Sequence, residues 1–306
     1  MTISLATHDA KPSRVFPTEG THGVDAYAYR YTIATLVTDR VQYDAMVSSF
    51  CARGFGGDDC EFIYIDNTGP DQMGAYSGLN AALSRSRGQY VVLCHQDVRL
   101  VDDTRVELDA RLDELDRLDP KWAIVGNAGG VCAGELAIRI SDPHGRDQRR
   151  GSFPARVASV DENFVVVRAA SRVGFSRDLD GFHLYGADLC LNADVRGYRS
   201  YVIDFHLKHL SAGNKDDAFS KSLQAFKDKW NTALRSRMIQ TTCTFAWVGG
   251  DRVGSNVRQV GEVVVPRWIR FCHRASDLLV ERCTQVRAWF LDNGPRVRVW
   301  PGQHDG

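Results

Sequence analysis

Three polar clusters follow three apolar segments in the first third of the chain. Each apolar segment predicts a strand, and one cluster stands at the carboxyl end of each: Thr38-Asp39, Asp66-Asn67 and His95-Gln96-Asp97. Ligands of open α/β sheets bind outside the carboxyl ends of the strands. We therefore expect the three clusters to meet in one crevice, with carboxylates that suit a hard divalent cation.

The residues directly after the first predicted strand limit the ways in which the chain could hold phosphate groups. A dinucleotide-binding Rossmann domain needs a GxGxxG turn there, because the backbone must approach the pyrophosphate closely. The sequence has Thr38-Asp39-Arg40 instead, and it has no GxxxxGK[ST] loop. A metal ion held by carboxylates is the remaining way to hold phosphates, and Asp97 is the first candidate ligand.

The elements that would position these residues alternate along the chain. Strands are predicted at 31–37, 61–65, 89–94, 122–125, 163–168 and 198–204, and helices at 41–52, 78–87, 104–118 and 187–195. Continuous apolar strands between helices indicate a mostly parallel sheet that is covered on both faces. Residues 139–156 are dense in Arg, Asp, Gly and Pro and predict a long mobile loop, either a solvated surface loop or a lid over the ligands.

Size and composition set the organisation and the location. We predict an irregular lead-in at 1–28, a catalytic α/β domain at 29–215 and a mainly helical extension at 216–306. Lys plus Arg and Asp plus Glu are both 38, which argues against a general nucleic-acid binder. The eight cysteines form no CxxC pair and suit reduced thiols. With no apolar stretch of about 18 residues and no signal-peptide core, a cytoplasmic location is expected.

The last part of the chain carries a second pattern. From Pro266 onward, apolar residues recur every three or four positions as far as 290 and predict an amphipathic helix flanked by arginines. One interpretation packs this helix on the catalytic domain or on a partner subunit of a homo-oligomer. The other places it on an anionic membrane surface, as a peripheral contact.

Four segments together resemble the family 2 glycosyltransferases and their close relatives, over about residues 30–215. They are IYIDNTG (63–69), GLNAALSRSRGQYVVLCHQDV (78–98), GFHLYGADLCLNADVRGY (181–198) and DFHLKHLSAG (204–213). The resemblance implies the GT-A fold, a nucleotide-sugar donor and a divalent metal, Mn²⁺ or Mg²⁺. It also implies inversion at the transferred sugar and a glycan, a lipid-linked sugar or a protein as acceptor.

The resemblance also assigns donor and metal positions. The donor pocket would contain Thr38, Asp39, Asp66, Asn67, Asn80 and Gln96. Thr38, Asp39 and Asp66 are equally typical of helix caps and turns. His95-Gln96-Asp97 matches the family's DxD metal motif, but His95 stands where the family has an acid. His95 is thus a second metal ligand, a donor to phosphate or a pocket wall.

The downstream motifs complete the expected site. Asp188 matches the acidic step at a helix start and would be the general base, although an acid there also complements the helix dipole. His183 and Tyr185 would line the acceptor pocket. His209 would approach the metal or the diphosphate, with His206 as its rival.

Two classes of function remain open from the sequence. The first is an active, metal-dependent glycosyltransferase. The second is a catalytically inactive GT-A-like module that binds a sugar nucleotide or a protein, because His95 replaces an expected acid. A nucleotidyltransferase is disfavoured, since it needs a glycine-rich loop with Arg or Lys after the first strand and the sequence has none there.

Overall fold

The computed structural model describes residues 27–213, 217–242 and 245–249. The chain divides into two compact units, residues 1–226 and 227–306. The boundary predicted near residue 215 stays a prediction. The amphipathic helix predicted after Pro266 lies outside the described residues, and so do its membrane and subunit contacts.

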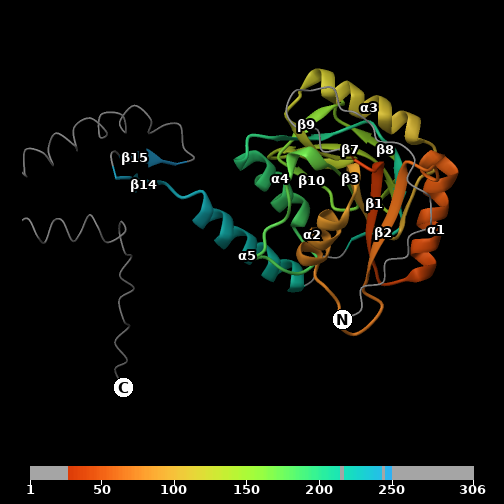
Figure 1. The fold of residues 1–306 in the computed structure, drawn as a ribbon, viewed down its shortest axis with the longest axis horizontal. Helices are drawn as coiled ribbons and strands as arrows, with labels where there is room; N and C mark the ends of the chain where they lie inside the picture. Colours follow the sequence, from red (N-terminus) through yellow and green to blue (C-terminus); the bar gives the residue numbers. More distant parts are fainter. Residues whose placement is uncertain (1–26, 214–216, 243–244, 250–306) are drawn as a thin grey trace, which may run out of the picture. The chain divides into compact units, whose positions relative to one another are not determined.

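The first unit is built on a seven-stranded sheet (Figure 1). In spatial order its strands are β2 (Cys60–Asp66), β1 (Tyr29–Val37), β3 (Gly88–Cys94), β11 (Phe164–Arg168), β5 (Trp122–Gly126), β12 (Arg199–Val202) and β9 (Ala155–Val157). β1 runs parallel to β2 and β3, and β5 runs parallel to β12, whereas β11 and β9 are antiparallel to their neighbours. The prediction of an α/β fold with a mostly parallel central sheet is confirmed.

Helices cover both faces of this sheet. α1 (Arg40–Phe50) and α3 (Arg105–Leu118) pack on one face, and α2 (Ala75–Arg85) and α4 (Tyr185–Val195) pack on the other. Successive strand residues supply the two cores, since Tyr90 and Val92 of β3 join the α1 side while Val91 and Leu93 join the α2 side. This two-sided burial explains why the strands are continuous apolar runs in the sequence.

A second, smaller sheet mixes parallel and antiparallel pairs. Its strands are β10 (Ser159–Val160), β6 (Ala128–Cys132), β7 (Glu135–Asp142), β13 (Leu207–His209) and β4 (Val98–Arg99), and β8 (Gly145–Arg150) pairs with β7. Two short helical turns, Cys51–Phe55 and Ala169–Ser171, also belong to the unit. β4 and β13 matter most here, because they bring distant parts of the chain together.

The prediction of a long loop at 139–156 is wrong, and the mobility predicted for the segment stays a prediction. Most of that segment is the hairpin of β7 and β8, which pair in antiparallel register. Its arginines are not simply solvated, because the Asp204 carboxylate accepts hydrogen bonds from Arg139 at 3.0 Å and from Arg149 at 2.8 Å. The charged residues of 139–156 suggest a loop in the sequence because their acidic partner, Asp204, lies more than fifty positions away.

The second unit contains the end of α5 (Asp217–Ala233) and an antiparallel hairpin of β14 (Arg237–Gln240) and β15 (Phe245–Val248). Across the described residues, none of the helices combines the length and the apolar character that a membrane span requires. The five cysteines in the described part are free thiols, of which Cys60, Cys94 and Cys190 are buried.

Candidate metal and donor site

His95, Asp97 and His209 form one group at the end of β3. The Nε2 atom of His209 lies 3.3 Å from Nδ1 of His95 and 3.3 Å from Oδ1 of Asp97. One ligand atom from each residue lies within 4.8 Å of the others. The side chains of Asp97 and His209 are 18% and 12% exposed, so the group is accessible without being free in solvent.

Strand pairing explains how residues 114 positions apart meet. Asp97 is followed at once by β4, and β4 pairs antiparallel with β13, which ends at His209. The backbone N–H of Leu210 donates to the carbonyl of Asp97 at 3.2 Å, and the N–H of Ser211 donates to its carboxylate at 3.2 Å. The sequence motifs identify the residues, and the β4–β13 pair sets the distance between them.

Tyr185 orients His95 by contacting Nε2, the ring nitrogen that does not face His209. The Tyr185 hydroxyl lies 2.7 Å from Nε2 of His95 and donates to the backbone carbonyl of Glu162 at 3.2 Å. With that proton used, Nε2–H of His95 is the donor to the hydroxyl, and Nδ1 keeps its lone pair toward His209. A hydrogen bond to the second ring nitrogen is the usual way in which proteins orient a histidine that binds metal.

The charge states of the group also suit a cation. Burial raises the pKa of Asp97, but the hydrogen bond and the charge of His209, with the bond from Ser211, outweigh burial and hold this pKa well below its usual range. Burial and the neighbouring His209 lower the pKa of His95. An ionised carboxylate and a neutral imidazole are the forms that bind metal.

Two of the three separations between ligand atoms in the group fit a single bound ion. Ligand atoms at about 2.1 Å from Zn²⁺, Mg²⁺ or a similar ion lie roughly 3.0–3.5 Å from one another. The two 3.3 Å separations at His209 fall in that range. Three protein ligands leave positions for oxygen atoms of a bound molecule, as in catalytic metal sites.

Gln96 joins this group to the end of β1. Its side-chain oxygen accepts from the backbone N–H groups of Thr38 and Asp39, both at 2.9 Å, and its amide nitrogen donates to the Thr38 hydroxyl at 2.8 Å. The expected meeting of the β1 and β3 clusters is therefore present. Asp39 also caps α1, because its carboxylate accepts from the N–H groups of Val41 and Gln42.

Asp66 lies at the end of β2, beside β1. It accepts from the N–H and the hydroxyl of Thr68, and Arg40 donates to it at 3.1 Å. The Thr68 hydrogen bonds and the Arg40 charge hold the pKa of Asp66 below its usual range. Arg40 also stacks over the Tyr64 ring at 4.0 Å, so a cation, an anion and an aromatic ring stand together at this strand end.

Asn67 and Asn80, two further predicted donor-binding residues, have structural partners. Asn67 is 1% exposed, and its amide exchanges two hydrogen bonds with the backbone of Met73. Asn80 exchanges two with the backbone of Phe175. Contact of Asn67 and Asn80 with the nucleotide-sugar donor stays a prediction. Their hydrogen bonds to the backbone argue against it, because these bonds occupy the side-chain amides.

Asp188, the predicted general base, is completely buried. Its carboxylate accepts from the Ser176 N–H at 2.8 Å, the Ser176 hydroxyl at 2.7 Å and the Asn192 amide at 3.0 Å. These bonds attach the start of α4 to the preceding segment. An acceptor hydroxyl could reach this carboxylate only if the protein opened locally, so the geometry disfavours the predicted role.

Glu162 is the titratable residue at this site that sequence reasoning missed. It is half-buried in the turn between β10 and β11, and its Oε1 accepts from the N–H of Gly186 in the first turn of α4 at 3.1 Å. Burial, with the charge of Asp161 adding to it, raises the pKa of Glu162 to about 8. No sequence signal marks this residue, because Asp161-Glu162 is typical of an ordinary polar turn.

The other two histidines of the predicted site lie apart from the metal group. The His183 ring packs on Phe219 at 5.5 Å between centroids, and its carbonyl accepts from the Tyr76 hydroxyl. His206 is 3% exposed and lies 3.2 Å from Asp102 and 2.9 Å from the Ser141 hydroxyl. His209, not His206, is therefore the histidine that joins Asp97.

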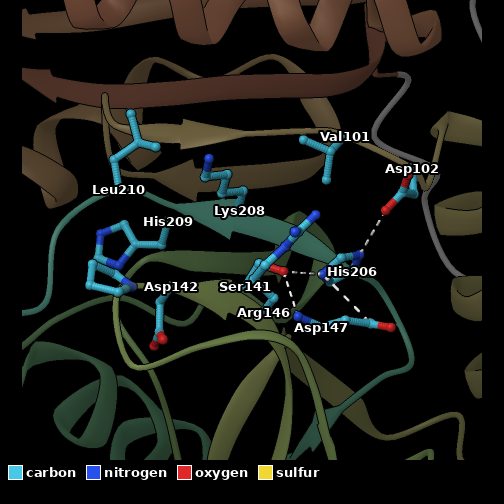
Figure 2. A pocket seen from close by; sticks show the side chains of 11 residues that line it. Val101, Asp102, Ser141, Asp142, Arg146, Asp147, His206, Lys208, His209 and Leu210 are labelled. Carbon is cyan, nitrogen blue, oxygen red and sulfur yellow. Dashed lines mark hydrogen bonds and ion pairs between the residues drawn. The ribbon is translucent and has the colours of Figure 1, made fainter.

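A cavity of about 760 Å³ borders the metal group on the side of β13 and the β7–β8 hairpin. Figure 2 shows His209 and Lys208 of β13 on its wall, together with Arg146 from the hairpin. Its volume lies within the roughly 300–1,000 Å³ range of small-molecule sites. The lining carries both signs of charge, since Asp142 and Asp147 face the same space as the two basic side chains.

One curated protein is similar over most of its length. ATP synthase subunits region ORF 6 of Fuscovulum blasticum is 37% identical to this chain over 232 residues, which cover 74% of this chain and 93% of the relative. No protein-family model matches the chain.

Solved structures are similar at lower levels. The mannosyltransferase PcManGT from Pyrobaculum calidifontis, in complex with GDP-Man and Mn²⁺, has 13% identity and a TM-score of 0.46, covering 66% of this chain and 64% of that one. GalNAc-T7 with UDP, GalNAc and Mn²⁺ has 7% identity and a TM-score of 0.45, covering 65% and 48%. This chain thus spans less than two thirds of each of these two structures.

Proposed function

This chain belongs to the family of the ATP synthase subunits region ORF 6 protein, and we propose that it is a GT-A-type glycosyltransferase that uses a nucleotide-sugar donor and a divalent metal. The observation that carries the proposal is the His95–Asp97–His209 group, placed at the same sheet edge as the β1 and β2 clusters. A metal group beside a strand-end crevice suits a substrate that contains a diphosphate.

The chemistry of the three ligand residues, His95, Asp97 and His209, favours Mn²⁺ over Mg²⁺. Mg²⁺ prefers oxygen ligands, whereas two imidazoles and one carboxylate suit a softer first-row ion. A bound divalent cation would neutralise the charge that develops on the departing nucleoside diphosphate. Asp97 provides the negative charge for such an ion, and Tyr185 keeps His95 in the orientation that binds it.

The donor's nucleoside would lie at the ends of β1 and β2. Gln96 fixes Thr38 and Asp39 in one arrangement, which supports a preformed pocket wall. Arg40, stacked on Tyr64 and paired with Asp66, offers both a cation and an acid to the ribose and the base. The neighbouring cavity of about 760 Å³ offers space for the acceptor.

The reaction we propose is direct displacement with inversion. An acceptor hydroxyl of a glycan, a lipid-linked sugar or a protein attacks the anomeric carbon, and the bond from that carbon to the diphosphate breaks. Displacement of this kind needs a carboxylate to take the hydroxyl proton. The sequence motif assigns that step to Asp188, whose burial argues for a structural role instead.

Donor hydrolysis tests the proposal without knowledge of the acceptor. A panel of UDP-sugars and GDP-sugars is incubated with the protein and Mn²⁺, and released nucleoside diphosphate is measured. We expect release from at least one donor, stopped by EDTA and restored by Mn²⁺. Tight Mn²⁺-dependent binding of a donor with no release would favour the inactive sugar-nucleotide-binding module.

A further inference from the structure

The cavity beside the metal group contains a serine that is hydrogen-bonded as a nucleophile would be. The Ser141 hydroxyl lies 2.9 Å from Nε2 of His206, and Nδ1 of the same ring lies 3.2 Å from Oδ2 of Asp102. All three residues line the cavity, and Figure 2 shows the hydrogen bonds that join them. A hydroxyl bonded to a base that a third group orients is the arrangement that activates a serine.

The Asp102 carboxylate sets the direction of both hydrogen bonds. Because a carboxylate can only accept, Nδ1 of His206 carries the ring proton and Nε2 keeps its lone pair. The Ser141 hydroxyl therefore donates to Nε2. The backbone N–H of Asp147 donates to the serine oxygen at 2.7 Å, and the second lone pair of that oxygen is available for a bond to carbon.

The imidazole is fixed and shielded from water, whereas the serine is accessible. His206 is buried, and its backbone N–H donates to the Asp103 carboxylate at 2.6 Å. Ser141 is half-buried on the cavity wall. A molecule in the cavity can therefore reach the hydroxyl, while the base bonded to that hydroxyl is held in one orientation.

Strand pairing places Ser141 close to the metal group. In the parallel pair of β7 and β13, Ser141 is the partner of Lys208, the residue that precedes His209. Neighbouring strands lie about 4.8 Å apart. The imidazole of His144 also donates to the carbonyl of Ala212 at 3.1 Å, so the turn after β7 contacts the segment that follows His209. Ser141 and His209 thus line the same cavity.

Two cations on the cavity wall suit the anionic part of a nucleotide-sugar donor. The side chains of Lys208 and Arg146 are exposed there, and neither forms an ion pair within the described part of the chain. Two acids of the lining do have partners, since Asp147 pairs with Arg139 and Asp142 accepts from the N–H groups of its own turn. The two cations are therefore available to a diphosphate that extends from the metal group into the cavity.

We propose that Ser141 is a glycosylation site of the protein itself, and that its hydroxyl accepts the sugar of a donor bound at the metal group. This inference rests on the proposed glycosyltransferase function. The serine oxygen forms a bond to the anomeric carbon, while the bond from that carbon to the diphosphate breaks. The diphosphate leaves with the electron pair of the broken bond, and the hydroxyl proton moves to Nε2 of His206. For this acceptor, an imidazole supported by the Asp102 carboxylate replaces the single carboxylate as base.

The test follows the mass of the protein. Wild type is incubated with Mn²⁺ and each UDP-sugar and GDP-sugar of the panel, and intact mass and released nucleoside diphosphate are measured before and after. We expect the addition of a single sugar from at least one donor, and peptide fragmentation should place it on Ser141. Ser141→Ala should lose the label, whereas Ser84→Ala, at an exposed serine of α2 outside the cavity lining, should keep it. Fragmentation of labelled wild type identifies the site even if Ser141→Ala fails to fold.

Asp102→Asn separates an activated serine from one that is merely exposed. The amide can donate to Nδ1 of His206, which favours the tautomer whose Nε2 carries the proton and cannot take another. The rate of labelling should fall about 10²–10⁴-fold. The Kd for donor with Mn²⁺, measured by calorimetry, should change less than about twofold. The Asp102 side chain is 75% exposed, so the substitution should leave the fold intact.

Each outcome decides the proposal. A label on Ser141 that is lost in Ser141→Ala and slowed in Asp102→Asn supports it. Release of nucleoside diphosphate by wild type with no gain in mass overturns it and leaves the glycosyltransferase proposal intact. A label on another residue, or one that forms at the wild-type rate in Asp102→Asn, also overturns it. Absence of both release and mass gain defeats both proposals.

Discussion

The end of β3 and the start of α4 both carry an aspartate in a motif that suggests catalysis, yet the two differ in what surrounds the carboxylate. Asp97 lies with two histidines and is 18% exposed. Asp188 is completely buried and accepts three hydrogen bonds from Ser176 and Asn192. The first arrangement leaves lone pairs for a ligand, whereas the second uses them to hold the fold.

The difference shows that an acid at a motif position acquires its role from its environment. A carboxylate whose hydrogen bonds all come from the protein stabilises the structure, and its loss leaves buried donors without partners. A carboxylate beside accessible imidazoles keeps capacity for a cation. Substitutions in the metal group should therefore change the affinity for Mn²⁺, whereas substitution of Asp188 should change the free energy of unfolding.

The largest effect is expected for Asp97→Asn in the metal group. The amide removes the only carboxylate of the described His95–Asp97–His209 group and leaves the fold's packing in place. Because loss of a residue that merely supports a ligand costs about 10–100-fold in metal affinity, loss of this ligand should cost at least about 100-fold. Calorimetric titration with Mn²⁺ measures it.

The matched control for that prediction is Asp102→Asn. Asp102 is 75% exposed and contacts His206 on the cavity wall, not the metal group. Its Mn²⁺ affinity should equal that of wild type. Equal affinities for all three proteins would show that the His95–Asp97–His209 group does not bind the ion.

At the start of α4, Asp188→Ala should act on stability. The substitution leaves the Ser176 N–H and the Ser176 hydroxyl without their acceptor, while the Asn192 amide keeps its bonds to the Ser176 hydroxyl and to the backbone carbonyl of residue 188. We expect the free energy of unfolding to fall by about 2 kcal/mol, measured by urea denaturation. A change below about 0.5 kcal/mol, with a large loss of turnover, would return Asp188 to the role of base.

Tyr185→Phe should have a smaller effect, and on the metal group. It keeps the ring that packs against Tyr76 and Phe175 but removes the hydroxyl that lies 2.7 Å from His95. Mn²⁺ affinity should fall about tenfold, at the lower end of the range for residues that hydrogen-bond to a metal ligand. An unchanged affinity in the same calorimetric titration would mean that His95 needs no such support.

The smallest effect is expected for Asp66→Asn at the end of β2. The amide oxygen can still accept from the Thr68 N–H, and the Arg40 pair that it weakens is 41% and 27% exposed. Exposed pairs contribute little, so the free energy of unfolding should change by less than about 0.5 kcal/mol. A loss above about 1.5 kcal/mol in urea denaturation would place Asp66 with Asp188, among the residues that hold the fold.

Most of the sheet and helices could be predicted from periodicity, because two-sided burial gives β1, β3 and β11 continuous apolar sequences. The metal group could be predicted as residue types, since His95, Asp97 and His209 stand in recognisable motifs. Its geometry could not, because it depends on the pairing of β4 with β13, two short strands with little pattern of their own.

The raised pKa of Glu162 could not be predicted from sequence patterns for a related reason. Its environment comes from Gly186 and Tyr185 of α4, more than twenty positions away. The burial that raises its pKa is a property of the packed protein. For Asp188 the sequence suggested catalysis where the structure shows burial. No pattern around Ser176 indicates that this residue donates two hydrogen bonds to the Asp188 carboxylate.

The central claim is that the His95–Asp97–His209 group binds a divalent cation that in turn holds a nucleoside diphosphate. Calorimetric titration of wild type and of Asp97→Asn with UDP and with GDP, each with and without Mn²⁺, tests it most directly. We predict that at least one nucleotide binds wild type at least about tenfold more tightly with Mn²⁺, and that Asp97→Asn abolishes this gain. Equal affinity with and without Mn²⁺, or a gain that survives in Asp97→Asn, would contradict it.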